Sequence, residues 1–247
     1  NLPAILYFWK NFSKTIMLEN ENQDRKSPAG HSPECFRELD PEELKLIEKK
    51  KTQLLYLKGE NLFKQGAFAP YVMYVVDGLV KLYLQTGANR QINIRLARRG
   101  DFLAFPVLFD ENIYAYSAVA LKDSAVCMID KEALLGLLKE NVGFALRITS
   151  KNFRHETFLL EIIKNLSYKQ MRGKLASALL YLSQPGFLAE EVFRHLTRQD
   201  IADFASISTE SAVKFLKEFE KEEIILLDGK DIVITDPKRL EEISIKG

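Results

Sequence analysis

Cysteine is scarce in this sequence, and its scarcity excludes several kinds of site. The 247 residues include two cysteines, Cys35 and Cys127, which lie far apart and form no CxxC pair. Two cysteines cannot build the disulfide framework of a small secreted protein. They are also too few for the four thiolates of an all-cysteine iron–sulfur or zinc site. Because histidine adds only three further candidate ligands, we expect no metal site, no iron–sulfur cluster and no haem.

A long apolar run and a dominant charge are also missing. No stretch approaches the roughly 20 apolar residues that cross a bilayer, so we expect no membrane partner. The lack of a disulfide framework suits a reducing compartment, so we expect a cytoplasmic location. The opening segment NLPAILYFWKNF has no basic region before it and no small-residue cleavage site after it, so it is not interpreted as a signal peptide. Lysine and arginine number 35 against 34 aspartates and glutamates, and this balance indicates no particular partner.

What is present is an ordinary globular composition, with 47% hydrophobic and 28% charged residues, over a length that favours two domains. The polar segment 19–30 predicts a flexible N-terminal extension over residues 1–34. Asp40 and Pro41 are typical of a helix start. Between residues 52 and 130, short apolar segments such as LVKLYLQ and QINIRLA alternate with turn signals. This pattern predicts an antiparallel β-barrel or sandwich as a domain over residues 35–130.

A helical region is expected over residues 131–166. Asp130 is placed to cap a first helix, and a long helix is expected from about Val142 to Leu166. One row of the long helix has the 3-4 spacing of a coiled-coil seam, which predicts pairing with a second copy of the chain. The predicted seam consists of Ala145, Ile148, Asn152, His155, Leu159, Ile162 and Leu166. The apolar residues off this row are expected to pack on the β-domain, and they are Phe144, Phe153, Phe158 and Ile163.

Two polar residues, Asn152 and His155, interrupt this apolar seam. One interpretation is that they fix the register of the paired helices at some cost in stability. The other is that they face a ligand or respond to protonation. The sequence leaves both interpretations open.

The last region, residues 167–247, begins with a helix expected over residues 167–184 and ended by a Pro-Gly pair. The segment FLAEEVFRHLT after it is interpreted as a strand or short hairpin. Near the end, ILLDGKDIVIT predicts a hairpin around Asp228 and Gly229. Such a hairpin is placed to act as a wing beside the helices that precede it.

Those helices lie in LTRQDIADFASISTESAVKFLKEFEKEEII, residues 196–225, and a tight turn joins them. Thr197 and Asp200 fit a capping box at the first helix, and Ser208 is placed to cap the second. The second helix has an apolar face and an opposite face of short donors and acceptors, as a helix that reads the major groove of DNA needs. The expected DNA contacts are Arg198, Gln199, Ser208, Thr209, Glu210, Ser211, Val213, Lys214, Lys217 and Lys230.

The order of these parts resembles the CRP/FNR family of bacterial transcription regulators. LTRQDIADFASISTESAVKFL is similar to that family's helix-turn-helix, YLKGENLFKQGAFAPYVMYVVDGLVKLY to its first β-roll strands, and RRGDFLAF to the glycine-acid turn of its effector cassette. The resemblance implies an α+β fold: an N-terminal antiparallel β-roll of the double-stranded β-helix or jelly-roll type, a long dimerisation helix and a C-terminal winged helix-turn-helix domain. It further implies a homodimer on a near-palindromic site in double-stranded DNA, and we expect RNA polymerase as another partner.

The resemblance assigns roles to several of the expected DNA contacts. Glu210 matches the family's base-reading glutamate, and Lys214 stands where the family usually has arginine. A lysine reaches guanine as a point charge, without the fork of an arginine. Arg198, Gln199 and Ser211 match positions that contact phosphate. The target sequence is therefore expected to differ from the family's usual half-site.

The effector cassette departs from the family's cyclic-nucleotide binders. Those proteins carry an Arg-Ser pair after the glycine-acid turn, and its arginine pairs with the cyclic phosphate, whereas NIYAYSAVA contains no arginine. A buried phosphate would be poorly compensated here, so we expect no tight cAMP binding. The β-roll either senses another, unidentified small molecule or has lost sensing. The residues expected around an effector are Gly100, Asp101, Phe102, Tyr116, Asn152 and His155.

Cys127 resembles the interior cluster ligand of the family's oxygen-sensing branch, and Cys35 lies near that branch's N-terminal cluster region. The branch uses four cysteines, and at most two are present here. Cys127 is therefore interpreted as a small buried hydrophobe.

Two functions from different classes remain open. The first is a dimeric, sequence-specific DNA-binding regulator of transcription. The second is a cyclic-nucleotide-type ligand-binding module whose helix-turn-helix contacts protein. Acidic residues slightly outnumber basic ones over residues 166–247, which is unusual for a DNA-binding domain and favours the second. An enzyme is not expected, because the sequence offers no nucleophile–base set, metal cluster or phosphate loop.

Overall fold

The structure is a computed structural model that describes residue 36 and residues 39–87, 90–109 and 112–246. Within the long helix, the side chains at 154–158, 161 and 164–166 are not described. Almost all described residues belong to one compact unit, Glu38–Gly247. The predicted N-terminal extension and Cys35 lie outside the described residues.

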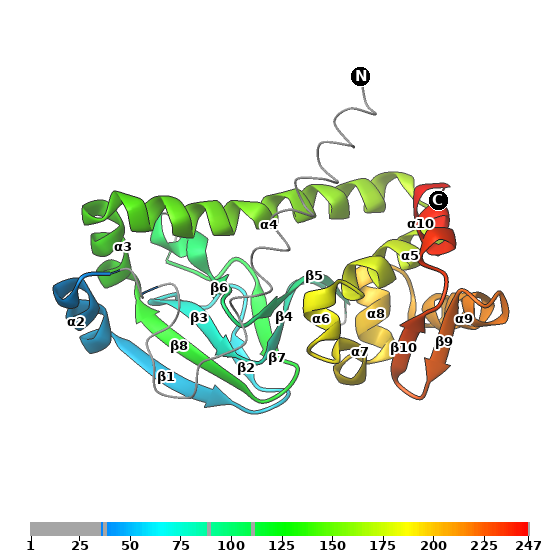
Figure 1. The fold of residues 1–247 in the computed structure, drawn as a ribbon, viewed down its shortest axis with the longest axis horizontal. Helices are drawn as coiled ribbons and strands as arrows, with labels where there is room; N and C mark the ends of the chain where they lie inside the picture. Colours follow the sequence, from blue (N-terminus) through cyan, green and yellow to red (C-terminus); the bar gives the residue numbers. More distant parts are fainter. Residues whose placement is uncertain (1–35, 37–38, 88–89, 110–111, 247) are drawn as a thin grey trace, which may run out of the picture. The chain divides into compact units, whose positions relative to one another are not determined.

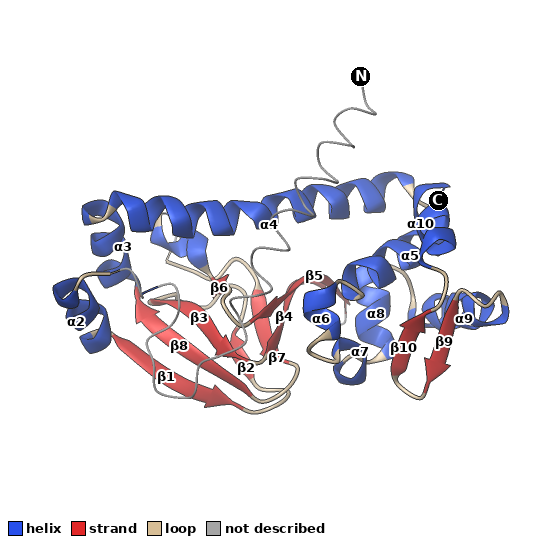
Figure 2. Cartoon of the chain, viewed as in Figure 1, coloured by secondary structure: helices blue, strands red, loops and turns tan. Residues whose placement is uncertain are grey.

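The predicted β-domain consists of two antiparallel four-stranded sheets (Figure 1, Figure 2), with strand orders β1-β8-β3-β6 and β2-β7-β4-β5. The strands are β1 (Lys51–Tyr56), β2 (Asn61–Phe63), β3 (Tyr71–Asp77), β4 (Leu79–Gly87), β5 (Arg90–Arg98), β6 (Phe102–Leu103), β7 (Ser117–Ala120) and β8 (Ser124–Asp130). A 3-10 helix, η2 (Phe105–Leu108), follows β6. Ahead of the strands, α2 (Pro41–Lys49) begins at the predicted cap, Asp40.

Gly78 makes the tight turn between β3 and β4 possible. Its φ is 115°, a conformation that residues with a Cβ rarely adopt. A Cβ placed there would lie 2.2 Å from the Oγ of Ser124. The same hydroxyl accepts a hydrogen bond from the N–H of Leu79 over 3.2 Å. The Asp-Gly turn signal therefore marks a close approach to β8 as well as a change of direction.

Helix α3 (Lys131–Glu140) begins at Asp130, whose side chain accepts from the N–H of Ala133, as predicted. Helix α4 (Val142–Tyr168) follows, and one of its faces is buried within the chain. Ile148, a predicted seam residue, is 3% exposed, so it packs inward instead of facing a partner.

The opposite face of α4 carries exposed apolar side chains. The prediction that Phe153 and Ile163 pack on the β-domain is wrong, because these residues are 57% and 58% exposed. A 3-4 spacing fits several neighbouring rows of one helix, and the packing of α4 on the chain decides which row is free. The free row, named here the α4 stripe, has heptad spacing and consists of Val142, Leu146, Phe153 and Leu160. Of the other predicted seam residues, Leu159 is 42% exposed, in agreement with a partner-facing position, and the side chains of His155 and Leu166 lie outside the description.

The remaining elements form the winged helix-turn-helix domain. They are α5 (Met171–Leu182), α6 (Pro185–Leu188), α7 (Val192–His195), α8 (Arg198–Ala205), α9 (Thr209–Lys221), β9 (Ile225–Asp228), β10 (Asp231–Ile234) and α10 (Pro237–Lys246). The strand or hairpin expected after α5 is wrong, because α6 and α7 occupy that segment. Pro185 stands in the first turn of α6, where a helix lacks a partner for its N–H. Val192 and Phe193 of α7 are buried in the domain core. Their apolar side chains therefore serve helix packing and do not indicate a strand.

Candidate nucleic-acid interface and effector region

Caps at both helix starts build the joint between α8 and α9. Thr197 and Asp200 form the predicted capping box at α8, and the hydroxyl of Ser208 accepts from the N–H of Ser211 at α9. Between the helices, Ser206 adopts a left-handed conformation with φ of 52°. These local interactions turn the chain within a few residues, as a helix-turn-helix requires.

Helix α9 is amphipathic in the predicted sense. Ala212, Leu216 and Phe219 are buried and hold the helix on the domain core. On the other face, Lys217 is exposed and the side chain of Lys214 is 70% exposed. This open face is available to a groove of DNA.

All ten expected DNA contacts have at least part of their surface accessible. Those that are exposed are Gln199, Ser208, Glu210, Lys214, Lys217 and Lys230, and those that are partly exposed are Arg198, Thr209, Ser211 and Val213. The guanidinium of Arg198 donates to the carbonyls of Gly229, over 2.9 Å, and Lys230, over 3.3 Å, in the turn of the wing. The structure therefore joins the start of α8 to the wing, two parts that the sequence treats separately.

The two base-reading candidates on α9, Glu210 and Lys214, are both exposed. Hydrogen bonds from its own backbone N–H and from the Ser208 hydroxyl lower the pKa of Glu210, and an ionised glutamate accepts from the amino group of cytosine. The Nζ of Lys214 lies 4.0 Å from the Glu218 carboxylate, one turn along the helix. Such an exposed pair contributes little to stability, so exchanging it for a base contact costs little.

The glycine-acid turn of the expected effector cassette is formed by Gly100, with φ of 92°, and Asp101. The Asp101 carboxylate accepts from the N–H of Arg98 over 3.0 Å and lies 3.7 Å from the guanidinium of Arg95. Arg95 is buried and also donates to the carbonyl of Phe102 over 3.0 Å. Arg95 of β5, which is not among the predicted effector residues, therefore partners the acid of this turn.

Aromatic side chains occupy the neighbourhood of Tyr116. Its ring centroid lies 5.6 Å from that of Phe63, and its hydroxyl accepts from the N–H of Ala104 over 2.7 Å. Burial raises the pKa of Tyr116, and the charge of Arg95 offsets part of this rise, so the side chain is a neutral phenol. Phe105 is also buried. This part of the expected effector region is lined by packed rings and a paired arginine.

The seam residue Asn152 donates its side-chain N–H to the carbonyl of Ile148 over 2.9 Å, a bond within its own helix. Its neighbour Lys151 approaches the glycine-acid turn, because a Cβ added to Gly100 would lie 3.0 Å from Lys151 Nζ. Lys151 therefore reaches the place beside the glycine-acid turn that is expected for Asn152 and His155.

Cys127 is buried in β8, and burial raises the pKa of its thiol to about 11. The thiol is protonated at neutral pH and behaves as a small apolar side chain. Among the described residues, no group of three or more His, Cys, Asp or Glu side chains is placed to hold a metal ion. Of the helices in the described ranges, none is long and apolar enough to cross a membrane.

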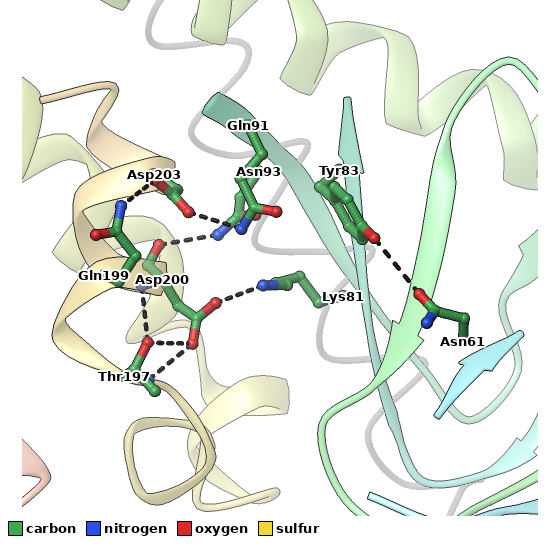
Figure 3. A network of polar contacts seen from close by, with 9 residues as sticks. All are labelled: Asn61, Lys81, Tyr83, Gln91, Asn93, Thr197, Gln199, Asp200 and Asp203. Atoms are coloured by element: carbon green, nitrogen blue, oxygen red, sulfur yellow. Dashed lines mark hydrogen bonds and ion pairs between the residues drawn. The ribbon is translucent and has the colours of Figure 1, made fainter. Parts of the chain in front are cut away.

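A set of polar contacts joins β4 and β5 to α8 (Figure 3). Lys81 forms an ion pair with the Asp200 carboxylate, Asn93 Nδ2 donates to the Asp200 carbonyl over 2.9 Å, and Gln91 Nε2 donates to Asp203 over 2.7 Å. Lys81, Asn93, Asp200 and Asp203 are buried. We name these five residues the β5 latch.

The sequence carries no local signal for the β5 latch. Lys81 and Asn93 interrupt the apolar strands LVKLYLQ and QINIRLA, and polar residues on one face of a strand are usually solvated. Here α8 covers that face. Burial raises the pKa of Asp200, but the Lys81 ammonium and hydrogen bonds from Lys81 and Thr197 outweigh it, so this pKa lies below its ordinary value.

Two family models match the chain, the cyclic nucleotide-binding domain over residues 53–141 and the Crp-like helix-turn-helix domain over residues 173–243. They coincide with the β-domain and the winged domain described above. The chain is a member of the CRP/FNR family. The resemblance and the fold class inferred from the sequence are thereby confirmed. This family consists of transcription regulators, in agreement with the expectation that the chain is not an enzyme.

Individual CRP/FNR proteins show the same similarity along most of the chain. It is 29% identical to the fumarate and nitrate reduction regulatory protein of Vibrio cholerae serotype O1, over 81% of this chain and 80% of that protein. It is 26% identical to the cAMP-activated global transcriptional regulator CRP of Salmonella typhimurium, over 72% of this chain and 87% of that protein. The solved structure of the c-di-GMP responsive global regulator CLP from Xanthomonas campestris shares the fold, with a TM-score of 0.68 at 18% identity over 79% of this chain and 99% of that one.

Proposed function

We propose that this CRP/FNR protein is a sequence-specific DNA-binding regulator of transcription that acts as a homodimer on a near-palindromic site. The observation that carries the proposal is the open face of α9. Its first half presents Glu210 and Lys214 to solvent while its other face is buried in the domain core. We expect the wing turn, joined to Arg198, to contact the phosphate backbone beside it.

The α4 stripe supports a homodimer. Four large apolar side chains at heptad spacing are exposed on one helix face, and a soluble protein normally covers such a row with a partner helix. A second copy of the chain offers the same stripe, so a twofold pairing covers both at once. A dimer then presents two α9 helices to successive major grooves.

Control by a ligand remains part of the proposal. A small molecule that favours one arrangement of the β-domain and α4 would shift the spacing of the two reading helices. The contact of Lys151 with the glycine-acid turn gives α4 a direct route to that region. A regulator bound beside a promoter is expected to contact RNA polymerase.

A mobility-shift assay on genomic fragments at two salt concentrations tests DNA binding. Specific retention with a steep loss at higher salt is expected. Retention of no fragment by an intact dimer would instead favour the alternative, in which the helix-turn-helix contacts protein. The slight acidic excess of the winged domain is the observation that keeps this alternative in view.

Lys214→Ala tests base reading by α9. We expect the variant to lose discrimination at one base pair of each half-site, a loss of about 1–3 kcal/mol. The measurement compares affinities for the specific site and for single-base variants of it. The matched control is Lys221→Ala, which removes an exposed lysine from the last turn of the same helix. Equal losses on specific and random DNA would make Lys214 a phosphate contact.

Cyclic AMP is expected to leave the protein unaffected. The cassette segment lacks an arginine, and Arg95 is already paired with Asp101. The midpoint of thermal unfolding is therefore expected to stay constant as cAMP is added, because only a ligand that binds the folded state raises it. A midpoint that rises with cAMP concentration would contradict this expectation.

A further inference from the structure

Strand β5 reverses the facing of its side chains at a β-bulge. Leu82 of β4 pairs with Arg95 and Tyr83 pairs with Asn93, so Ile94 is the extra residue. An extra residue shifts the alternation of the strand. Asn93 therefore reaches α8, whereas Arg95, two positions on, reaches Asp101 and β6. One strand touches both the glycine-acid turn and the helix-turn-helix.

On the α8 side, a chain of hydrogen bonds continues from Gln91 to the reading helix. Gln91 donates to one oxygen of Asp203, and Gln199 donates to the other over 2.7 Å (Figure 3). The hydroxyl of Thr209, at the start of α9, donates to Gln199 Oε1. Gln199 and Thr209 are two of the expected DNA contacts. Their polar groups are thus engaged inside the chain, through a carboxylate that a strand of the β-domain holds.

The docking of β4 and β5 on the winged domain is a packed contact as well as a polar one. Leu79 and Leu96 of the β-domain belong to the apolar core of the winged domain, and the N–H of Leu96 donates to the Tyr181 hydroxyl over 2.9 Å. Buried charges such as Lys81 and Asp200 are stable only when paired. A packed interface of this kind has two discrete states, closed and open, as a switch requires.

We propose that the β5 latch is an autoinhibitory contact that holds the helix-turn-helix in a state of low DNA affinity. While it is closed, Gln199 and Thr209 donate and accept within the chain, and α8 is fixed to the β-domain. Opening it releases Asp203, the acceptor of the Gln199 amide, from the β-domain and lets α8 and the winged domain move to meet DNA. Because β5 also carries Arg95, an event at the glycine-acid turn is transmitted to the latch through the same strand. This inference rests on the proposed function as a DNA-binding regulator.

Gln91→Ala tests the latch with a small, uncharged change that leaves the electrostatic attraction of the protein for DNA unaltered. Its matched control is Gln85→Ala, at the residue paired with Gln91 across the hairpin, where the side chain donates to the carbonyl of Gly87 over 2.6 Å. We expect Gln91→Ala to raise affinity for a DNA fragment retained by the wild-type protein about 3- to 10-fold, the change that corresponds to one net hydrogen bond. We expect Gln85→Ala to leave the affinity unchanged.

Hydrogen–deuterium exchange of the DNA-free proteins provides a second readout. The amides of α8 and the first turn of α9 are expected to exchange faster in Gln91→Ala than in the wild-type protein and in Gln85→Ala. Faster exchange with unchanged or lower DNA affinity would overturn autoinhibition and make the contact a positioning one. Unchanged exchange would show that Gln91 does not restrain α8, and would also overturn the proposal. If the wild-type protein retains no DNA at all, the proposed function fails, and autoinhibition of DNA binding fails with it; the exchange data then still report whether the latch restrains α8.

Discussion

Asp200→Asn is expected to lower the free energy of unfolding by about 3–5 kcal/mol, the usual cost of breaking a buried ion pair from one side. Asp200 pairs with Lys81 across the domain boundary and closes the capping box of α8 with Thr197. The substitution leaves the buried Lys81 ammonium without its counter-charge and replaces a carboxylate oxygen at the cap by an amide. Denaturant unfolding followed by circular dichroism measures the change.

The control is Asp77→Asn at the exposed end of β3, where a change within about 0.5 kcal/mol is expected. A loss below about 1 kcal/mol for Asp200→Asn would show that the pair is solvated and the β5 latch loose.

The same ion pair predicts a dependence on pH. The pKa of Asp200 in the folded protein lies below its ordinary value, which is about 3.9 in an unfolded chain. The stability that this carboxylate contributes is therefore fully present above about pH 4 and is lost as the pH falls through the lower, folded pKa. The difference between the wild-type protein and Asp200→Asn is expected to shrink in that acid range. If the difference in unfolding free energy between the two proteins stays constant down to the pH at which the wild-type protein unfolds, this prediction is wrong.

Leu160→Glu is expected to separate the dimer and to weaken binding to a palindromic site by about 100-fold or more, because a monomer loses the second, linked half-site contact. Leu160 lies in the α4 stripe and is 66% exposed within the chain, so the charge does not disturb the monomer's core. In a twofold dimer it would place two like charges in one apolar seam. Sedimentation velocity measures the oligomeric state, and the mobility shift measures affinity.

The matched control is Leu188→Glu, the same exchange at a leucine of α6 that is 47% exposed. It is expected to leave the oligomeric state unchanged. If Leu160→Glu stays dimeric while Ile148→Ala, in the originally predicted seam, dissociates the dimer without unfolding it, the partner covers a different face of α4.

The helix-turn-helix was predictable from the sequence because its signals are local. A capping box joins residues three positions apart, and an Asp-Gly pair turns a hairpin by its own backbone preferences. For this reason the caps at Thr197 and Ser208 and the wing hairpin appear where the sequence predicts them. The strand or hairpin expected at α6 and α7 is wrong because the Pro-Gly pair, interpreted as the end of the preceding helix, also begins α6. The apolar spacing after it does not distinguish a short helix from a strand.

The sequence by itself determined the order of the domains and the open face of the reading helix, because these follow from short-range spacing and caps. The family followed from the resemblance of its motifs. Tertiary structure alone decided which face of α4 is free, since several rows of one helix share the same 3-4 spacing. It also decided that Arg95 partners the glycine-acid turn and that Lys81 meets Asp200 from 119 residues away along the chain. Nothing local distinguishes a lysine on a solvated strand from one that a helix covers. The physical reason is that burial and pairing depend on what packs against a residue, and that is fixed only when distant segments meet.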